Sequence, residues 1–323
     1  MSSIEDHFIA IILALAADAL IGEPRALWQR VPHPVVLMGR LISWLDQEFN
    51  VDTATARERR SAGIVAIVGL LFSALVVGQV VAILLAFLPF TVLFEAAILA
   101  ALLAGRSLYD HVRSVALGLA EGGLEGGRRA VAHIVGRDLD GLDEPAVARA
   151  AIESAGENYS DGVVAPVFWF ALLGLPGVIA YKLVNTADSM IGHRTDRHGE
   201  FGMATARLDD VLNWVPARLS GWLIVLAALF AGADAEGAVR AMRADADRHG
   251  SVNAGWPEAA MGGALGLALA GPRTYGGKRI DDAWMNRAGR EDADIADIHS
   301  ALRLLIWACV VHGAVYALLA ILF

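Results

Sequence analysis

The sequence predicts an all-α, polytopic integral membrane protein with about 5–7 membrane-embedded helices, each needing roughly 20 apolar residues. Of its 323 residues, 56% are hydrophobic and 19% charged, and the mean hydropathy is +0.51. A soluble domain carries about 25% charged residues, so this chain has too little polar surface to cover a fold in water. Some embedded helices should be re-entrant or broken, and amphipathic helices should lie on the cytoplasmic side.

Apolar runs of different lengths supply the expected helices. Residues 64–90 can cross a bilayer once; Pro89 then breaks the run, and residues 92–104 offer a shorter return segment. Residues 304–323 form a third long run. Residues 163–181 are interrupted at Gly174–Gly177, which favours a re-entrant element lined by protein. Weaker candidates are residues 8–21, 219–231 and 261–270.

The basic residues indicate the topology. Every Lys and Arg lies in one of five polar segments, 23–61, 105–161, 182–218, 233–255 and 272–303. Positive loops prefer the cytoplasm, so the apolar segments between them should enter and leave in pairs. We therefore expect a multi-pass protein of the cell (inner) membrane whose polar loops are cytoplasmic. The first residues lack a basic region and a cleavage site, so residues 8–21 should be a retained helix. With no linker evident, residues 1–323 should form a single domain.

Charge and cysteine content exclude several classes of function. The formal net charge is −9 and the pI about 5.5, which is unsuited to binding nucleic acid. The single cysteine, Cys309, excludes an internal disulfide framework and a cysteine-based zinc site. Its apolar surroundings favour a small core residue.

Three polar clusters lie between residues 153 and 218. The first runs from Glu153 to Gly162, where Glu153 and Glu157 should share a helix face and Asp161 with Gly162 should form a turn into the membrane. Asn158 lies between them. The pattern fits a carboxylate cluster that carries Mg²⁺ and phosphate, or equally a solvated helix end.

In the second cluster, Asn185, Asp188 and Ser189 share one helical face directly after an apolar segment. Hard oxygen ligands at this spacing can hold Mg²⁺ through one or two carboxylates plus a substrate phosphate. Arg194 and Arg197 follow and could clamp phosphate.

The third cluster begins a further helix. Asp209 and Asn213 are four residues apart, and Asp210 precedes Asn213 by three. Adjacent carboxylates that enter an apolar helix need a cation or an arginine to offset their charge. Arg207 and Arg218 could supply it, or could bind phosphate.

Two further regions have distinctive local sequences. Pro32 and Pro34 hold His33 in extended backbone, which suits display of its side chain, and Arg40 follows. A rigid turn at the membrane surface explains this pattern equally well. Residues 271–279 resemble a phosphate loop, but Lys278 is one place late and Arg279 replaces the Ser or Thr, so no ATP motif is recognisable.

Six stretches, in order, resemble the CobD/CbiB family of cobalamin-biosynthesis membrane proteins, the adenosylcobinamide-phosphate synthases. They are HPVVLMGRLI (33–42), ESAGENYSDGVVAP (153–166), YKLVNTADSMIGHRTDRHGEFG (181–202), ARLDDVLNWVPARL (206–219), HGSVNAGWPEAAMGGALG (249–266) and PRTYGG (272–277). The resemblance implies an ATP- and Mg²⁺-dependent ligase. It would join aminopropanol, or its O-phosphate, to the free carboxylate of adenosylcobyric acid and give adenosylcobinamide or its phosphate.

The resemblance also implies roles for the clustered residues. Those that position metal or amine are Glu157, Asp161, Asp188, Asp209 and Asp210, of which Asp188, Asp209 and Asp210 are the candidate metal ligands. Those that orient the substrate are Asn158, Asn185 and Asn213. Those that bind substrate or phosphate are His33, Arg40, Arg194, Arg197, Arg207 and Arg218. The expected partners are the two substrates, the bilayer and other proteins of the cobalamin pathway.

Two alternatives remain at this stage. One is an Mg²⁺-dependent transferase that acts on diphosphates, because Asn185, Asp188 and Asp196 loosely resemble its aspartate-rich motif, although the spacing differs. The other is a transporter, in which Asp18, Glu95 and His312 would line an ion path.

Overall fold

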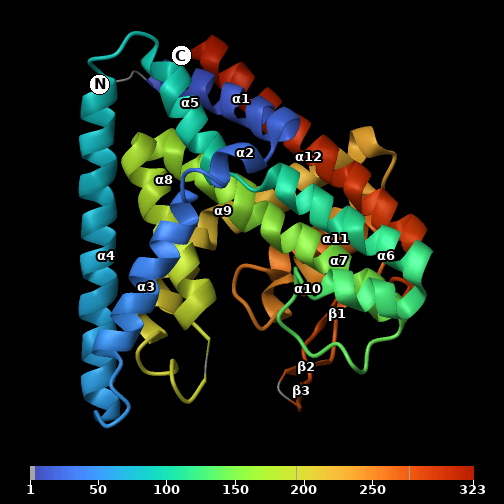
Figure 1. Cartoon of the computed structure of the whole chain (residues 1–323). Helices are drawn as coiled ribbons and strands as arrows, with labels where there is room; N and C mark the ends of the chain where they lie inside the picture. The colour runs from blue at the N-terminus through green and yellow to red at the C-terminus, as the bar shows by residue number, and fades with distance from the viewer. Residues whose placement is uncertain (1–3, 194, 276) are drawn as a thin grey trace. The chain divides into compact units, whose positions relative to one another are not determined.

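The computed structural model describes residues 4–193, 195–275 and 277–323, and most of that chain is helical (Figure 1). The α-helices are α1 (Ile4–Ile21), α2 (Arg25–Trp28), α3 (Pro34–Phe49), α4 (Ala56–Leu85), α5 (Thr91–Leu102), α6 (Gly105–Val131), α7 (Glu144–Tyr159), α8 (Ala165–Ile191), α9 (Met203–Ala231), α10 (Ala235–Asp245), α11 (Gly255–Leu265) and α12 (Ile295–Leu322). A π-helical turn, η1 (Ser160–Val164), joins α7 to α8, and a 3₁₀ turn, η2 (Ala246–Arg248), follows α10.

Within the described residues, five helical stretches are long and apolar enough to cross a membrane. They are Ala56–Leu85, Thr91–Val131, Glu144–Ile191, Met203–Ala231 and Ile295–Leu322. The prediction of an all-α polytopic membrane protein is therefore confirmed, and the predicted break in residues 163–181 is present. At Gly174 the backbone of α8 leaves the helical region, with φ 63° and ψ −147°, a conformation that favours glycine.

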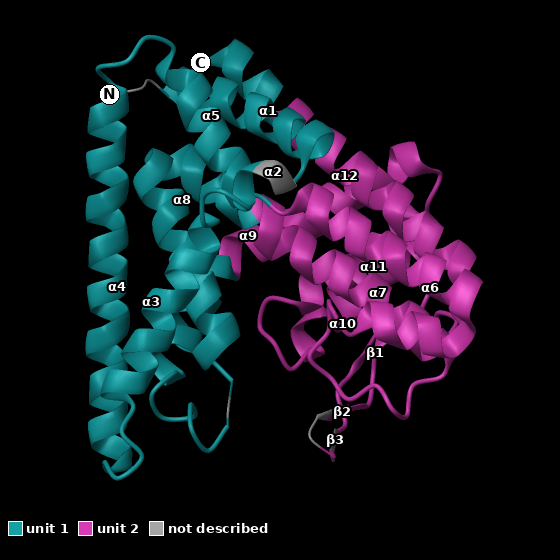
Figure 2. Ribbon diagram, in the orientation of Figure 1, with its two compact units in different colours: residues 1–103, 165–213, 316–323 teal, residues 104–164, 214–315 magenta. Residues whose placement is uncertain are grey.

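The chain forms two compact units, each assembled from separate segments (Figure 2). Unit 1 comprises residues 1–103, 165–213 and 316–323, and unit 2 comprises residues 104–164 and 214–315. The chain therefore passes from one unit to the other four times. Whether they make one domain, as the sequence predicts, stays a prediction.

Unit 1 is built on two helix pairs, α4 with α8 and α1 with α5. Gly78 permits the first pair, because a Cβ there would lie 2.5 Å from the Pro176 Cα. One core cluster packs residues of α1, α5 and α8 around Phe8 and Phe170, and a second packs α3, α4 and α8 around Ile42 and Phe201.

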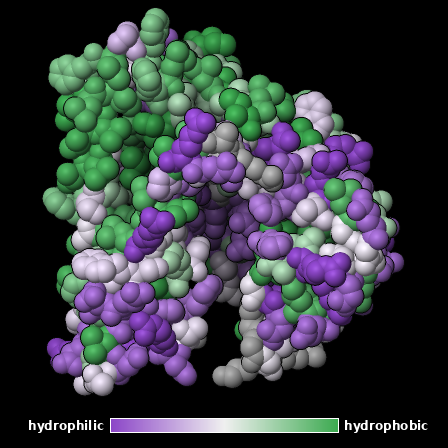
Figure 3. Space-filling model, viewed as in Figure 1, coloured by the Kyte–Doolittle hydropathy of each residue, from purple (hydrophilic) through white to green (hydrophobic). Residues whose placement is uncertain are grey.

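The surface of unit 1 changes character along α4 (Figure 3). Apolar side chains such as Val65, Phe72 and Phe87 are exposed along most of the helix. Polar surface covers the end that holds the start of α4 and the loop before α9. An apolar flank that ends in a polar rim is what a helix needs to pass from lipid into water.

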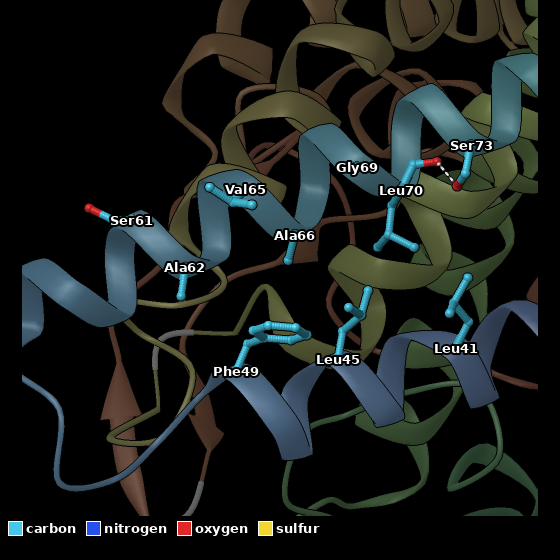
Figure 4. A pocket seen from close by; sticks show the side chains of 10 residues that line it. All are labelled: Leu41, Leu45, Phe49, Ser61, Ala62, Val65, Ala66, Gly69, Leu70 and Ser73. Carbon is cyan, nitrogen blue, oxygen red and sulfur yellow. Dashed lines mark hydrogen bonds between the residues drawn. The ribbon is translucent and has the colours of Figure 1, made fainter.

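A groove of about 550 Å³ lies between α3 and α4 (Figure 4). Leu41, Leu45 and Phe49 of α3 face Ala66 and Gly69 of α4 across it. Its lining is almost wholly apolar, and Ser73 directs its hydroxyl to the Leu70 carbonyl at 2.8 Å rather than to a ligand. The groove therefore offers no polar chemistry.

Unit 2 packs α6 against α7 and α10 against α11. Leu108, Val112 and Val115 form the buried side of the amphipathic helix α6. Asp143 caps α7 by accepting a hydrogen bond from the Ala146 backbone N–H at 2.9 Å.

One local expectation in unit 2 is wrong. Residues 160–164, with Asp161 and Gly162, form the π-helical turn η1 instead of a turn out of the helix. The Gly-rich stretch after α11 forms two small antiparallel sheets, because its turns fold short strands back on each other. The strands are β1 (Leu269–Ala270) with β4 (Trp284–Met285), and β2 (Arg273–Tyr275) with β3 (Lys278–Ile280).

Candidate functional site

Unit 1 holds a cluster of carboxylates and amides, which we call the amide–carboxylate cluster. Its members are Tyr181, Asn185, Asp188, Asp209 and Asn213. The Asn213 Nδ2 donates to Asp209 Oδ2 at 2.9 Å, and the Asn185 Nδ2 to Asp209 Oδ1 at 3.5 Å. The Tyr181 hydroxyl donates to Asn213 Oδ1 at 2.9 Å, which fixes the orientation of that amide. Helices α8 and α9 thus bring together three predicted site residues around one carboxylate.

Asp209 is the buried centre of this cluster, with 9% of its surface exposed. The negative charges of Asp188 and Asp210 act on Asp209, whose two carboxylate oxygens accept hydrogen bonds from Asn213 and Asn185. A buried carboxylate held by neutral amides beside further negative charge is an environment that attracts a cation.

Asp188 reaches this position because Gly192 leaves room for it. A Cβ at residue 192 would collide with the Asp188 Oδ1, so the carboxylate lies directly over the glycine. The Gly192 backbone N–H also donates to the Asp188 carbonyl at 2.7 Å and ends α8 there. The local sequence therefore fixes both the helix end and the carboxylate.

The donor set fits Mg²⁺, which prefers oxygen ligands and keeps few protein ones. Among the residues that the structure describes, no three His, Cys, Asp or Glu side chains converge closely enough to hold a metal alone. Asp188 and Asp209 could hold the ion with Asn185 and Asn213 nearby, leaving other positions to a substrate phosphate.

Asp210, although adjacent to Asp209, has a different environment. Its side chain is 39% exposed and lies 3.9 Å from the Arg207 guanidinium, which is itself 72% exposed. Successive helical residues point about 100° apart, so both carboxylates cannot face the cluster equally.

Arg197 belongs to a separate polar network at the rim of unit 1. It donates to Asp46 Oδ2 through Nε at 3.1 Å and Nη2 at 3.0 Å, and it lies 3.3 Å from Asp52. Asn50 and Arg59 bind the Arg197 backbone carbonyl. This arrangement favours a role in holding the loop before α9. Burial raises the pKa of Asp46, but hydrogen bonds from Asn50 and Arg197 outweigh it and leave the pKa below its usual value.

The remaining predicted residues of unit 1 lie on α3 or outside the described chain. His33 caps α3, its Nδ1 accepting from the Val35 N–H at 3.2 Å, and its ring packs edge-on against Trp28. Burial lowers the pKa of His33. Arg40 is exposed, and Arg194 lies outside the described residues. Their substrate-binding roles stay predictions.

Unit 2 contains a second buried polar group, which we call the Arg273 cluster. Its members are Arg137, Glu153, His249, Glu258, Arg273 and Asp282. Glu153 Oε2 accepts from Arg137 at 2.7 Å, and its Oε1 accepts from the Ala270 N–H at 2.9 Å. This half of the cluster ties α7 to β1.

The other half surrounds the Arg273 guanidinium. Its Nη2 lies 3.2 Å from His249 Nε2, 3.6 Å from Glu258 Oε2 and 3.7 Å from Asp282 Oδ2. Burial raises the pKa of Glu258 well above its usual value, and the charge of Arg273 offsets this only in part. Burial also lowers the pKa of His249, against the opposing charge of Asp282.

The predicted residues at the end of α7 lie beside this cluster or on the surface. Glu157 is exposed, and its charge interacts with those of His249 and Glu258. The Asn158 amide donates to the Ser154 carbonyl and hydroxyl, at 3.0 Å each. Asp161 lies half-buried in η1, and π-helical turns of this kind occur frequently at functional sites.

Arg218 lies between two aromatic rings of unit 2. Its guanidinium is 4.2 Å from the Trp214 ring centroid and 4.6 Å from that of Trp256. Its Nη1 donates to the Trp214 carbonyl at 2.8 Å. These contacts fix the Arg218 side chain, so its remaining guanidinium N–H groups are already oriented to donate to an anion.

Sequence reasoning missed the Arg273 cluster, although two motifs that carry the family resemblance contain His249, Glu258 and Arg273. The available signal was Glu258 itself. A glutamate within an apolar helix of small residues needs a partner, and that need could have drawn attention to its surroundings.

The fold and these sites define a helical membrane protein with buried carboxylates in both of its units and largely buried arginines in unit 2. The CobD/CbiB protein family model matches residues 11–305, so the chain belongs to the CobD/CbiB family. It is 50% identical over 303 residues to the cobalamin biosynthesis protein CobD of Brucella anthropi, covering 93% of each chain. It is 48% identical to the CobD of Rhizobium meliloti (97% of each chain) and 43% identical to that of Rhodobacter capsulatus (97% of each). No solved structure matches the chain.

Proposed function

We propose that this protein acts in cobalamin biosynthesis as an adenosylcobinamide-phosphate synthase. It joins aminopropanol, or its O-phosphate, to the free carboxylate of adenosylcobyric acid at the expense of ATP. Membership of the CobD/CbiB family and the names of the relatives support the pathway. The observation that carries the chemistry is the amide–carboxylate cluster, with its buried Asp209 beside Asp188.

Amide formation from a carboxylate requires activation, because an amine does not displace hydroxide at a useful rate. Phosphorylation of the acid by ATP gives an acyl phosphate, and attack by the amine then releases phosphate. Bound Mg²⁺ would supply neutralisation of the phosphate charge. Asp188 and Asp209 would hold the ion, while Asn185 and Asn213 orient the phosphate-bearing group.

Positioning the amine is the second requirement, because a held nucleophile reacts faster than one in free solution. We assign this role to Glu157 and Asp161 at the end of α7. Arg207 and the fixed guanidinium of Arg218 would hold phosphate groups.

We also propose that the protein spans the cell (inner) membrane with its polar segments in the cytoplasm. The five candidate spans support membrane insertion, and the restriction of basic residues to the polar segments supports this orientation.

The test is product formation by the purified protein in lipid. Adenosylcobyric acid, ATP, Mg²⁺ and aminopropanol or its O-phosphate are supplied, and corrinoids are identified by mass spectrometry. We expect cobinamide or its phosphate only when ATP, Mg²⁺ and amine are all present. Asp188→Ala should abolish the product, whereas Glu236→Gln, an exposed carboxylate on α10, should leave it intact.

Two results would contradict the proposal. Flux of a solute into vesicles without product would indicate a transporter. Product from a prenyl diphosphate, with adenosylcobyric acid unchanged, would indicate the transferase alternative.

A further inference from the structure

His249 in the Arg273 cluster has donors and acceptors near both ring nitrogens. Its Nδ1 lies 3.0 Å from the Ser251 backbone N–H, which requires an acceptor. The same nitrogen lies 3.3 Å from the Ser251 carbonyl, which requires a donor. Either protonation state of Nδ1 therefore has a backbone partner.

The other nitrogen, Nε2, has the same choice. Arg273 Nη2 at 3.2 Å can donate to it, while Glu258 Oε2 at 3.6 Å and Asp282 Oδ2 at 3.7 Å lie within ion-pair distance of its protonated form. With the proton on Nδ1, the ring donates to the Ser251 carbonyl and accepts from Arg273. With the proton on Nε2, the ring accepts from the Ser251 N–H and directs its own N–H toward the two carboxylates. The ring can thus accept or release a proton without moving.

Glu258 is the second half of this arrangement. It is 1% exposed, and no described residue hydrogen-bonds its Oε2, which faces Arg273 and His249 at 3.6 Å. Burial raises the pKa of Glu258 and lowers the pKa of His249, so it disfavours the charged form of both groups.

The charges that face this pair come from every element around it. They are Glu153 and Glu157 of α7, Arg137 before α7, Arg273 of β2 and Asp282 after β3. Two guanidiniums face three carboxylates besides Glu258, so the group has no excess of positive charge. One further proton can then enter at His249, where carboxylates stabilise it.

Arg273 also connects the cluster to open space. With Thr274 it lines a cavity of about 780 Å³ in unit 2, opposite the loop of residues 138–143. Arg273 is thus a member of the cluster that borders this cavity.

The proposed reaction releases a proton that something must accept. When the nitrogen of an ammonium group forms the C–N bond and the C–O bond to phosphate breaks, the nitrogen loses two protons. The leaving phosphate takes the bonding electron pair and one proton. The second proton must go to a base.

We propose that His249 and Glu258 form the proton-accepting pair for this amide-forming step, with Arg273 as the fixed cation that positions them. This inference rests on the proposed function and adds a second working region, in unit 2, to it. A general base of this kind contributes roughly 10²–10⁴-fold to the rate.

The test compares His249→Gln and Glu258→Gln with two exposed controls of unit 2, His133→Gln and Glu236→Gln. The full-length protein in lipid is assayed for cobinamide phosphate across a range of pH, with kcat and KM for the amine separated. In the wild type we expect kcat to fall in acid as His249 protonates, below its usual pKa of 6.5. His249→Gln should lower kcat roughly 10²-fold, remove this acid limb and change KM little.

Glu258→Gln should keep the fold, since it removes only a proton-binding oxygen, and should also flatten the acid limb. Titration of ¹⁵N-labelled histidine by NMR provides a measure independent of activity, because the His249 signal should titrate below 6.5 and shift in Glu258→Gln. If both variants keep the wild-type pH profile, or lose only affinity for the amine, the proton-accepting role is wrong while the ligase stands. If the wild type makes no product, the proposed function fails and this inference with it.

Discussion

Both buried polar clusters contain carboxylates that are shielded from water, and the two clusters stabilise them in different ways. In unit 1, the amide–carboxylate cluster stabilises Asp209 with the neutral amides of Asn185 and Asn213, beside the second carboxylate of Asp188. In unit 2, the Arg273 cluster sets guanidiniums against its carboxylates. The first arrangement keeps negative charge and suits binding of a cation. The second is close to neutral and suits holding the structure together and moving a proton.

The largest expected effect tests the first arrangement. Asp209→Asn should reduce the rate of product formation by about 10²-fold or more, because it removes the buried charge that would hold Mg²⁺. Its neighbour Asp210, half-exposed beside Arg207, is the matched control, and Asp210→Asn should cost much less. Rates measured over a range of Mg²⁺ concentrations check this. Equal losses in both variants would mean that the cluster is not centred on Asp209.

The second arrangement predicts a loss of stability. Glu153→Gln keeps an oxygen for the Ala270 N–H but leaves Arg137 buried without its partner, and it should lower the free energy of unfolding by about 3 kcal/mol. Adding Arg137→Met should restore much of that loss. Denaturant unfolding in detergent measures both.

A control for this experiment comes from unit 1. Glu200→Gln breaks the partly exposed pair with Arg60, 2.7 Å apart, and should cost less than about 1 kcal/mol. A similar cost for the buried and the exposed pair would remove the distinction between the Arg273 cluster and an ordinary surface network.

A smaller effect tests whether the position of the Asp188 carboxylate over Gly192 matters for activity. Gly192→Ala places a Cβ against the Asp188 carboxylate and should reduce activity, with a loss of unfolding free energy on the order of 1 kcal/mol. Gly69→Ala meets nothing within 4 Å and should stabilise α4 by about 0.5–1 kcal/mol without affecting activity. Thermal melts and product assays on both variants separate the two effects. Full activity in Gly192→Ala would show that the position of Asp188 does not matter.

The smallest expected effect is an opposite response of the two units to acid. The lowered pKa of Asp46 means that its contribution to stability is present above 3.8, the usual pKa, and is lost as pH falls below it. The raised pKa of Glu258 means that its contribution is full below 4.5 and is lost as pH rises through the higher folded pKa. Amide hydrogen exchange should therefore show acid weakening the rim of unit 1 while it strengthens α11. Asp46→Asn and Glu258→Gln should each cancel one response.

The sequence predicted most of the fold because hydrophobicity and helix boundaries are local properties. The apolar runs, the break at Gly174 and the cap at Asp143 are each determined by residues that are close in sequence. The spacing of Asp209 and Asn213 likewise predicted a shared helical face, which their hydrogen bond confirms.

The remainder depends on residues that are distant in the chain. The contact of Glu153 with the Ala270 N–H spans 117 residues, and that of Arg197 with Asp46 spans 151. The periodicity of apolar residues along the sequence does not indicate which distant residues pair. Arg197 therefore resembled a phosphate clamp in the sequence, whereas in the structure its guanidinium binds Asp46.

The division of the chain into interleaved segments has a consequence for its synthesis. Residues 316–323 belong to unit 1, where the Tyr316 ring lies 5.8 Å from that of Phe8 at the opposite end of the sequence. During translation, the core around Phe8 therefore stays incomplete until these residues leave the ribosome, after all of unit 2 has been made. Helix α1 therefore gains this neighbour only after the other helices of unit 1 have been made.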